Sequence, residues 1–251
     1  MTHRRHAATI RRVARRRTTL DVMSDLVARV REVLPSVRAD LEDLVRIPSV
    51  WADPARQGEV HRSAALTAKL LSDAGFGEVH IVQEGGAPAV IARHPAPEGA
   101  PTVLLYAHHD VQPEGDVAQW DSAPFEPTER DGRLYGRGSA DMKAGIVAYT
   151  QAFKALQRLG YEPAAPVYLQ SVVEEECTGN GALACLVEGY TADAAIIPEP
   201  FEGVMSAQMG VMWLTIDVHG LPVHASVAHT GLSAIAYAQQ MVEWLRELET
   251  A

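Results

Sequence analysis

Four groups of potential metal ligands lie along the sequence, at the ends of predicted strands or, for one aspartate, at the start of a predicted helix. The groups are His108-His109-Asp110, Asp141, Glu174-Glu175-Glu176 and Glu199. Open α/β sheets build their sites at the carboxyl ends of strands, so these side chains are expected to converge. Carboxylates that lie close together repel one another unless cations neutralise their charge. The pattern therefore predicts a site for two divalent cations.

Each group has a simpler explanation when it is taken alone. His108 and Asp110 can form an ordinary surface hydrogen bond, although the same spacing lets a carboxylate hold one imidazole nitrogen while the other binds a metal. Asp141 can be a helix N-cap. Three consecutive glutamates usually belong to a solvated face, but here they follow residues 168–173, which have the pattern of a buried strand. Four such coincidences are improbable, so the metal-site hypothesis is favoured.

The spacing of apolar residues predicts the elements that carry these groups. A helix begins at Ser24 and ends at Ile47-Pro48, and Pro35 splits or kinks it. Further helices are predicted over 60–74, 142–159, 181–188 and 232–249. Strands are predicted over 79–82, 89–93, 102–107, 166–173, 193–197 and 210–218. Residues 111–140, rich in Pro, Gly and Asp, are predicted to form a long functional loop.

This alternation of strands and helices predicts an α/β sheet with helices on both faces. With 251 residues, 47% hydrophobic and 22% charged, the chain has the composition of a globular protein. No apolar run is long enough to span a bilayer, so no membrane association is expected. Two cysteines, Cys177 and Cys185, cannot form a disulfide framework, which favours a reducing, cytoplasmic setting.

The net charge of -10 is unevenly distributed along the chain. Residues 1–17 contain seven arginines and no acid, whereas the rest of the chain is strongly acidic. The acidic body repels phosphates, so no nucleic-acid partner is expected. No apolar core follows the arginines, which excludes a secretion signal. Residues 1–23 are interpreted as a disordered extension, with an organelle transit peptide as the alternative.

The combined motifs resemble the co-catalytic zinc hydrolase family of acetylornithine deacetylase, succinyl-diaminopimelate desuccinylase, aminoacylase and carboxypeptidase G. The resemblance covers roughly residues 38–251. It rests on the segments 105–113 and 136–143, the glutamates, Glu199-Pro200 and the segment 220–226. It implies a three-layer zinc-exopeptidase-like catalytic domain, over residues 24–205, and the start of an α+β lid or dimerisation domain over 206–251. The family has a further zinc-binding histidine downstream, so the chain is expected to be incomplete at its C-terminus.

The resemblance also implies a set of metal ligands. Asp141 corresponds to the carboxylate that bridges two zinc ions, with Co²⁺ or Mn²⁺ as possible substitutes. His108 and Glu199 would bind one zinc, and Glu176 would bind the other. A cis peptide bond is expected after Asp141.

Three other residues correspond to the family's catalytic groups. Glu175 resembles the general base, and Asp110 resembles the residue that orients His108. His224 resembles the lid-domain histidine that stabilises the oxyanion across a dimer interface. The register of the three glutamates is chosen because Gly181 then falls where the family has a glycine.

The implied function is that of a zinc-dependent hydrolase that cleaves the amide bond of an N-acyl amino acid, a small-molecule substrate. One alternative is a metallo-dipeptidase or carboxypeptidase of the same family. Another is a non-catalytic dimerising fragment, although Glu175 and Asp141, which degenerate relatives lose, are both present. A homodimer is the expected assembly.

Overall fold

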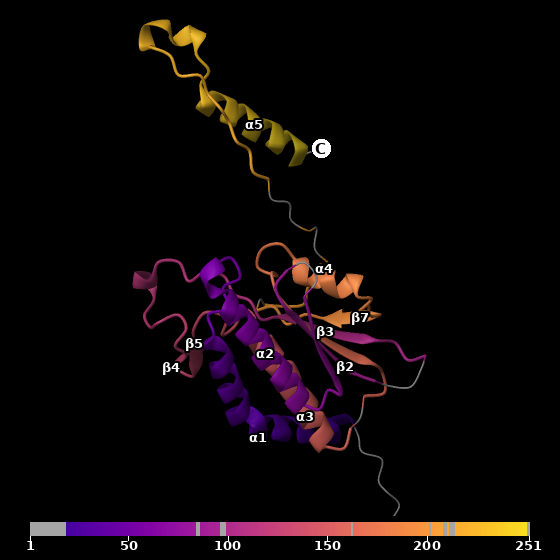
Figure 1. Cartoon of the computed structure of the whole chain (residues 1–251). Helices are drawn as coiled ribbons and strands as arrows, with labels where there is room; N and C mark the ends of the chain where they lie inside the picture. Colours follow the sequence, from indigo (N-terminus) through magenta and orange to yellow (C-terminus); the bar gives the residue numbers. More distant parts are fainter. Residues whose placement is uncertain are drawn as a thin grey trace, which may run out of the picture. The chain divides into compact units, whose positions relative to one another are not determined.

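The computed structural model describes residues 19–83, 86–95, 99–161, 163–200, 202–207, 210 and 214–249. The predicted Arg-rich extension lies outside these residues as far as residue 18, but residues 19–23 are helical rather than disordered. The chain divides into two compact units, Met1–Phe201 and Glu202–Ala251 (Figure 1). Every helix in the described part of the chain is too short or too polar to cross a membrane.

The first unit is built on a five-stranded mixed sheet with the order β1-β2-β6-β3-β7. Its strands are β1 (Glu78–Val82), β2 (Ala89–His94), β3 (Val103–His108), β6 (Val167–Val172) and β7 (Ala194–Ile196). Strand β3 runs parallel to β6 and β7, whereas β2 is antiparallel to both β6 and β1. Five of the predicted strands are thus confirmed. Because β3, β6 and β7 are parallel, their carboxyl ends meet at one edge of the sheet.

Helices cover both faces of this sheet, as the sequence predicts (Figure 1). Helices α1 (Thr19–Val45), α2 (Gln57–Asp73) and α3 (Lys143–Arg158) build the larger core with alternate residues of β2 and β6, among them Val90, Ala92 and Leu169. On the other face, α4 (Asn180–Val187) contributes Cys185 to a smaller core that contains Ile91 and Val172. Neighbouring strand residues enter opposite cores because strand side chains alternate between faces.

Pro35 lies inside α1, so the predicted split into two helices does not occur. Proline removes one backbone N–H and crowds the preceding turn. Here its ring is exposed, and packing of Val33, Val37 and Leu44 from the same helix into the cores of the unit holds the helix on both sides of it. The burial of this apolar face outweighs the local disadvantage of the proline.

The segment 111–140 is not a structureless loop, which corrects the sequence-based prediction. It contains a 3-10 turn (Val117–Gln119) and a hairpin of β4 (Thr128–Arg130) and β5 (Arg133–Tyr135). The hairpin turns at Asp131 and Gly132, whose φ angles are 50° and 73°. An Asp-Gly pair is a strong signal for such a two-residue turn, and it is visible in the sequence.

The second unit contains a 3-10 segment (Ala225–Thr230) and helix α5 (Ala234–Glu249), which confirms the predicted final helix. A bridge joins Leu221 to Leu232. The strand predicted over 210–218 is not observed: residues 214–218 are irregular, and residues 211–213 lie outside the described part of the chain.

Candidate metal centre

Four chain segments bring their metal-type side chains together at the carboxyl edge of the sheet. His108 is the last residue of β3 and is paired in register with Val172, the last residue of β6. The Nε2 atom of His108 lies 3.1 Å from Oδ1 of Asp141, 3.7 Å from Oε2 of Glu175 and 3.8 Å from Oε1 of Glu199. The convergence expected from the sequence is therefore present in the structure.

The ligand atoms form two overlapping groups of the size that a metal ion requires. One group consists of His108, Glu175 and Glu199, and the other of His108, Asp141 and Glu176. Within each group the candidate ligand atoms lie within 4.8 Å of one another. The two groups share His108, so the imidazole lies at the centre of the cluster.

Asp110 lies two residues after His108 and contacts its ring through the backbone as well as the side chain. The Nδ1 atom of His108 lies 3.0 Å from the carbonyl oxygen of Asp110 and 3.5 Å from its carboxylate Oδ1. The Asp110 side chain is fully buried, and both of its carboxylate oxygens lack a hydrogen-bond partner among the described residues. With Nδ1 directed toward Asp110, Nε2 is left to face the carboxylates of the cluster.

His109, in contrast, faces away from the cluster. Its ring is fully buried, and Nε2 donates to the carbonyl oxygen of Pro88 at 2.8 Å. Burial lowers the pKa of His109 to about 4, so the ring is neutral at ordinary pH. Its own carbonyl oxygen accepts hydrogen bonds from the hydroxyl groups of Ser49, at 2.6 Å, and Ser63, at 3.2 Å. The contacts of His109 are therefore with the protein interior and not with the metal-type residues.

Burial raises the proton affinity of the glutamates in the cluster, whereas that of Asp141 is lowered. Burial raises the pKa of Glu199 to about 7, and repulsion from Asp141 adds to this although His108 opposes it. Burial also raises the pKa values of Glu175 and Glu176. The hydrogen bond with His108 lowers the pKa of Asp141. Burial would lower the pKa of His108, but the nearby carboxylates of Asp110 and Asp141 outweigh this effect and raise that pKa to about 11.

This donor set fits divalent metal ions. Among the described residues, the ion-pair partner of Asp141, Glu175 and Glu199 is His108 rather than a lysine or arginine. One imidazole is too little positive charge for a cluster of carboxylates, which makes a divalent cation the natural counter-charge. Imidazole nitrogen together with carboxylate oxygen suits zinc, and manganese or cobalt can use the same ligands.

The two glutamates of the cluster differ in their contacts. Glu176 has a hydrogen-bond partner in Gln112, whose amide donates to the Glu176 carboxylate at 3.1 Å and to its backbone carbonyl at 2.7 Å. Gln112 was not identified as a site residue from the sequence, although it lies four residues after His108. The first of the three glutamates, Glu174, is buried and has its own partners, Thr178 and Ala87.

A cis peptide bond and a buried lysine follow Asp141 at the start of α3. The peptide bond between Asp141 and Met142 is cis, as the resemblance implies. The Lys143 side chain is fully buried, and its Nζ atom donates to the carbonyl oxygens of Leu44 and Ile47, at 2.9 and 2.8 Å. Lys143 thus joins α3 to the chain at the end of α1, and a buried lysine in this role was not foreseen from the sequence.

His224 belongs to the second unit, whereas the residues that form the cluster belong to the first. Its Nδ1 atom lies 2.8 Å from the Ser226 hydroxyl oxygen and accepts from the Ser226 backbone N–H at 3.2 Å. These contacts fix the ring at the start of the 3-10 segment. The oxyanion role implied by the resemblance stays a prediction.

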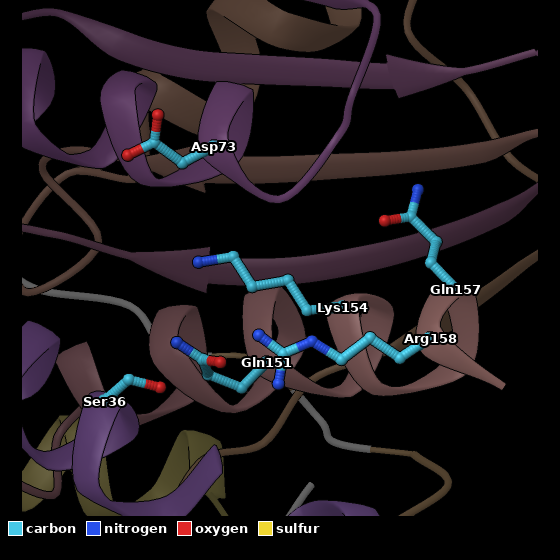
Figure 2. A pocket seen from close by; sticks show the side chains of 6 residues that line it. All are labelled: Ser36, Asp73, Gln151, Lys154, Gln157 and Arg158. Carbon is cyan, nitrogen blue, oxygen red and sulfur yellow. The ribbon is translucent and has the colours of Figure 1, made fainter.

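A hollow lies between α1, α2 and α3, and Figure 2 shows the side chains around it. Its volume is about 540 Å³, and its lining is polar: Ser36, Asp73, Gln151, Lys154, Gln157 and Arg158. With one carboxylate and no imidazole, this lining lacks the ligand set of a divalent metal site. Among the described residues of the first unit, the groups that could hold a metal ion lie at the sheet edge.

Comparison with known proteins places this site in a family. The peptidase family M20/M25/M40 matches residues 104–248. Succinyl-diaminopimelate desuccinylase of Paracoccus denitrificans is 32% identical over 83% of this chain and 54% of its own length. A Bacillus subtilis enzyme named N-formyl-4-amino-5-aminomethyl-2-methylpyrimidine deformylase is 30% identical over 79% of this chain and 49% of its own length. The chain thus spans about half the length of these curated relatives.

Solved structures agree with this placement. The M20 family metallo-carboxypeptidase Sso-CP2 from Sulfolobus solfataricus superimposes with a TM-score of 0.57 and 26% identity, over 64% of this chain and 37% of that one. Human carnosine dipeptidase 1 has a TM-score of 0.62 at 24% identity, over 70% of this chain and 41% of its own, which shows a shared fold. The family match covers more than half of the chain and includes β3, Asp141 and the glutamates. The chain therefore belongs to the peptidase family M20/M25/M40.

Proposed function

We propose that this chain provides the catalytic part of a metal-dependent hydrolase that cleaves the amide C–N bond of an N-acyl amino acid. The observation that carries the proposal is the cluster of His108 with four carboxylates at the carboxyl edge of the sheet. Family membership supports it. The names of the two curated relatives, a desuccinylase and a deformylase, support removal of an acyl group from nitrogen.

The proposed ligands are taken from the residues of the two groups, and their division between two metal ions is the one that the resemblance implies. His108, Asp141 and Glu199 would hold one zinc ion, and Asp141 and Glu176 would hold the second. Zinc in such a site lowers the pKa of water and polarises the scissile carbonyl group. The two carboxylates nearest to Nε2 of His108 are those of Asp141 and Glu175. The 3.1 Å contact between His108 and Asp141 supports placing these two residues on one metal ion, and the role of Asp141 as the shared ligand follows the resemblance.

Glu175 is the proposed general base. Its carboxylate would take a proton from the attacking water and deliver it to the nitrogen of the leaving amine. Burial raises the pKa of this carboxyl group, which brings its proton affinity closer to that of a group operating near neutral pH. Asp110 would keep the His108 ring in the orientation that leaves Nε2 facing the cluster.

The remaining features of the proposal concern the whole protein. Residues 24–205 would form the catalytic part and residues 206–251 the start of a lid and dimerisation domain, with His224 reaching the oxyanion across a homodimer interface. A cytoplasmic location is proposed from the cysteine content. A carboxypeptidase or dipeptidase activity is the second candidate, and the 26% identity with the metallo-carboxypeptidase Sso-CP2 favours it.

The test is a substrate panel with two matched variants. N-acetyl, N-succinyl and N-formyl amino acids and dipeptides are assayed with added zinc, using a chain extended to the length of its relatives. We expect Glu175→Gln to reduce turnover about 10²–10⁴-fold, the range for a general acid–base group, while the zinc content stays unchanged. Glu176→Gln should instead reduce zinc content.

Each outcome distinguishes between assignments. If the two variants behave in the opposite way, the roles of Glu175 and Glu176 are exchanged. If the wild-type protein binds zinc but cleaves only dipeptides, the second candidate function is correct. Full turnover by Glu175→Gln on every substrate would refute the proposed base.

A further inference from the structure

Glu174, the first of the three glutamates, is buried and hydrogen-bonded on both carboxylate oxygens. Only 4% of its surface is exposed. Oε1 accepts the backbone N–H of Ala87 at 3.3 Å, and Oε2 accepts the hydroxyl group of Thr178 at 2.6 Å. Gly86 passes so close that an added Cβ would lie 2.8 Å from Oε1 of Glu174. The side chain therefore connects the turn after β6 to the segment that leads into β2.

The backbone of Glu174 makes the turn that presents the next two glutamates. Its φ angle of 61° lies in the left-handed region, which residues with a side chain seldom adopt. Its carbonyl oxygen accepts the N–H groups of Cys177, Thr178 and Gly179, at 3.3, 3.1 and 2.8 Å. Because this conformation is unfavourable by itself, contacts elsewhere must stabilise it, and the two hydrogen bonds of the carboxylate are suited to do so.

The end of β3 is fastened to the same place. His109 directly follows His108, and its Nε2 atom donates to the carbonyl oxygen of Pro88 at 2.8 Å. Ala87 and Pro88 are adjacent, so one short backbone segment receives a buried side chain from each of the two strand ends. Glu174 precedes Glu175 and Glu176, just as His109 follows His108, so each anchor is one residue away from the metal cluster.

We propose that Glu174 and His109 are positioning residues, which fix the two ligand-bearing strand ends relative to each other by binding the shared segment Ala87-Pro88. Neither side chain belongs to the metal-type groups of the cluster. This inference rests on the proposed function, because it assumes that the cluster binds metal. Of the three consecutive glutamates, the first would then be an anchor, and the next two would belong to the metal centre.

The test compares variants of equal size at each anchor. Glu174→Met keeps the volume but leaves the Ala87 N–H and the Thr178 hydroxyl group without an acceptor. Glu174→Gln keeps one acceptor for Ala87 and an amide that can donate to Thr178, whose hydroxyl can also accept. His109→Leu and His109→Gln form the equivalent pair, since the glutamine amide can donate to Pro88. Glu188→Met, at the exposed position that directly follows α4, is the control.

The readouts are Co²⁺ titration by absorption spectroscopy, the melting temperature, and kcat and KM on the best substrate of the panel. We expect Glu174→Met and His109→Leu to weaken Co²⁺ binding about 10–100-fold, the usual effect of losing support behind metal ligands. They should lower kcat more than they raise KM. Both glutamine variants and the control should stay within about threefold of the wild type. Thr178→Val, which removes one contact, provides a milder test if Glu174→Met does not fold.

A melting temperature that falls while Co²⁺ affinity and kcat are unchanged in Glu174→Met and Thr178→Val would overturn the inference. Failure of both glutamine variants to rescue binding would overturn it as well. A wild-type chain that binds no Co²⁺ would refute the proposed function together with the inference. A wild-type chain that binds Co²⁺ as tightly as its methionine and leucine variants do would refute the inference alone. The double variant Glu174→Met/His109→Leu tests whether the two anchors act on one segment. A loss of Co²⁺ affinity, in free energy, that is smaller than the sum of the two single losses would support a shared segment.

Discussion

Gly181 offers a direct test of how closely α4 must pack against the end of β6. A Cβ atom at this position would lie 2.3 Å from the carbonyl oxygen and 2.7 Å from the nitrogen of Val173. Both are backbone atoms, which cannot rotate away, so Gly181→Ala should cost the upper end of the overpacking range, about 3 kcal/mol. Alanine is favoured over glycine inside a helix by about 1 kcal/mol. The net destabilisation is therefore about 2 kcal/mol, or roughly 4–8 °C in melting temperature for a chain of this size.

The same substitution should weaken the metal centre, because Val173 directly precedes the three glutamates. Thermal unfolding and Co²⁺ titration of the variant measure the two effects. Gly58→Ala is the matched control, since Gly58 lies in α2 with open space around it and its variant should be as stable as the wild type or slightly more stable. A Gly181→Ala chain with an unchanged or raised melting temperature and wild-type Co²⁺ affinity would refute this account of the helix packing.

Two further predictions concern metal and the buried lysine. Chelation should lower the melting temperature by roughly 5–11 °C relative to the protein with zinc at a hundred times its dissociation constant, because such binding stabilises the folded state by about 2.7 kcal/mol. An unchanged melting curve after verified metal removal would refute the metal site. Lys143→Met should destabilise the chain by roughly 2–5 kcal/mol at pH 8, because the carbonyl oxygens of Leu44 and Ile47 lose their donor. Burial lowers the pKa of Lys143 from 10.5 to about 7, so between these values the unfolded chain binds more protons and the stability of the wild type rises with pH. Denaturant titrations from pH 7 to pH 10 should therefore show a widening difference between wild type and variant, and a constant difference would contradict the assignment.

Much of the first unit could be predicted from the sequence because its elements carry strong local signals. The central strands are short, largely apolar runs, the amphipathic helices follow the period of 3.6 residues, and their predicted bounds differ by one or two residues from those observed in most cases. The predictions fail for two different reasons: at Pro35 tertiary packing overrides a local signal, and at the hairpin the strands themselves carry little signal. Pro35 does not divide α1, since the helix is held by apolar contacts on both sides of the proline. The hairpin at Asp131-Gly132 was missed because its strands are only three residues long and have no apolar alternation.

The positions of the metal-type residues were predictable for a different reason. The carboxyl ends of parallel strands necessarily share one edge of a sheet, so His108, Glu175 and Glu199 could be placed together before any geometry was known. The residues that support them could not be predicted from the sequence. Lys143 and Gln112 act through carbonyl groups or through a neighbour's carboxylate, and these partners are distant in sequence. The pattern of residue types along the sequence does not reveal such contacts.

The three glutamates show where residue types become ambiguous and backbone conformation decides. In a continuing strand, successive side chains point to opposite faces, so two consecutive residues cannot both reach one cluster. Glu175 and Glu176 both lie near His108, which requires the chain to leave the strand just before them. It does so at Glu174, whose left-handed backbone ends the extended conformation after Val172 and Val173. The residue that makes this turn must tolerate an unfavourable φ angle, and the buried hydrogen bonds of its carboxylate supply the compensation. A third acidic residue in the run is thus explained by the turn that makes the other two neighbours in the cluster.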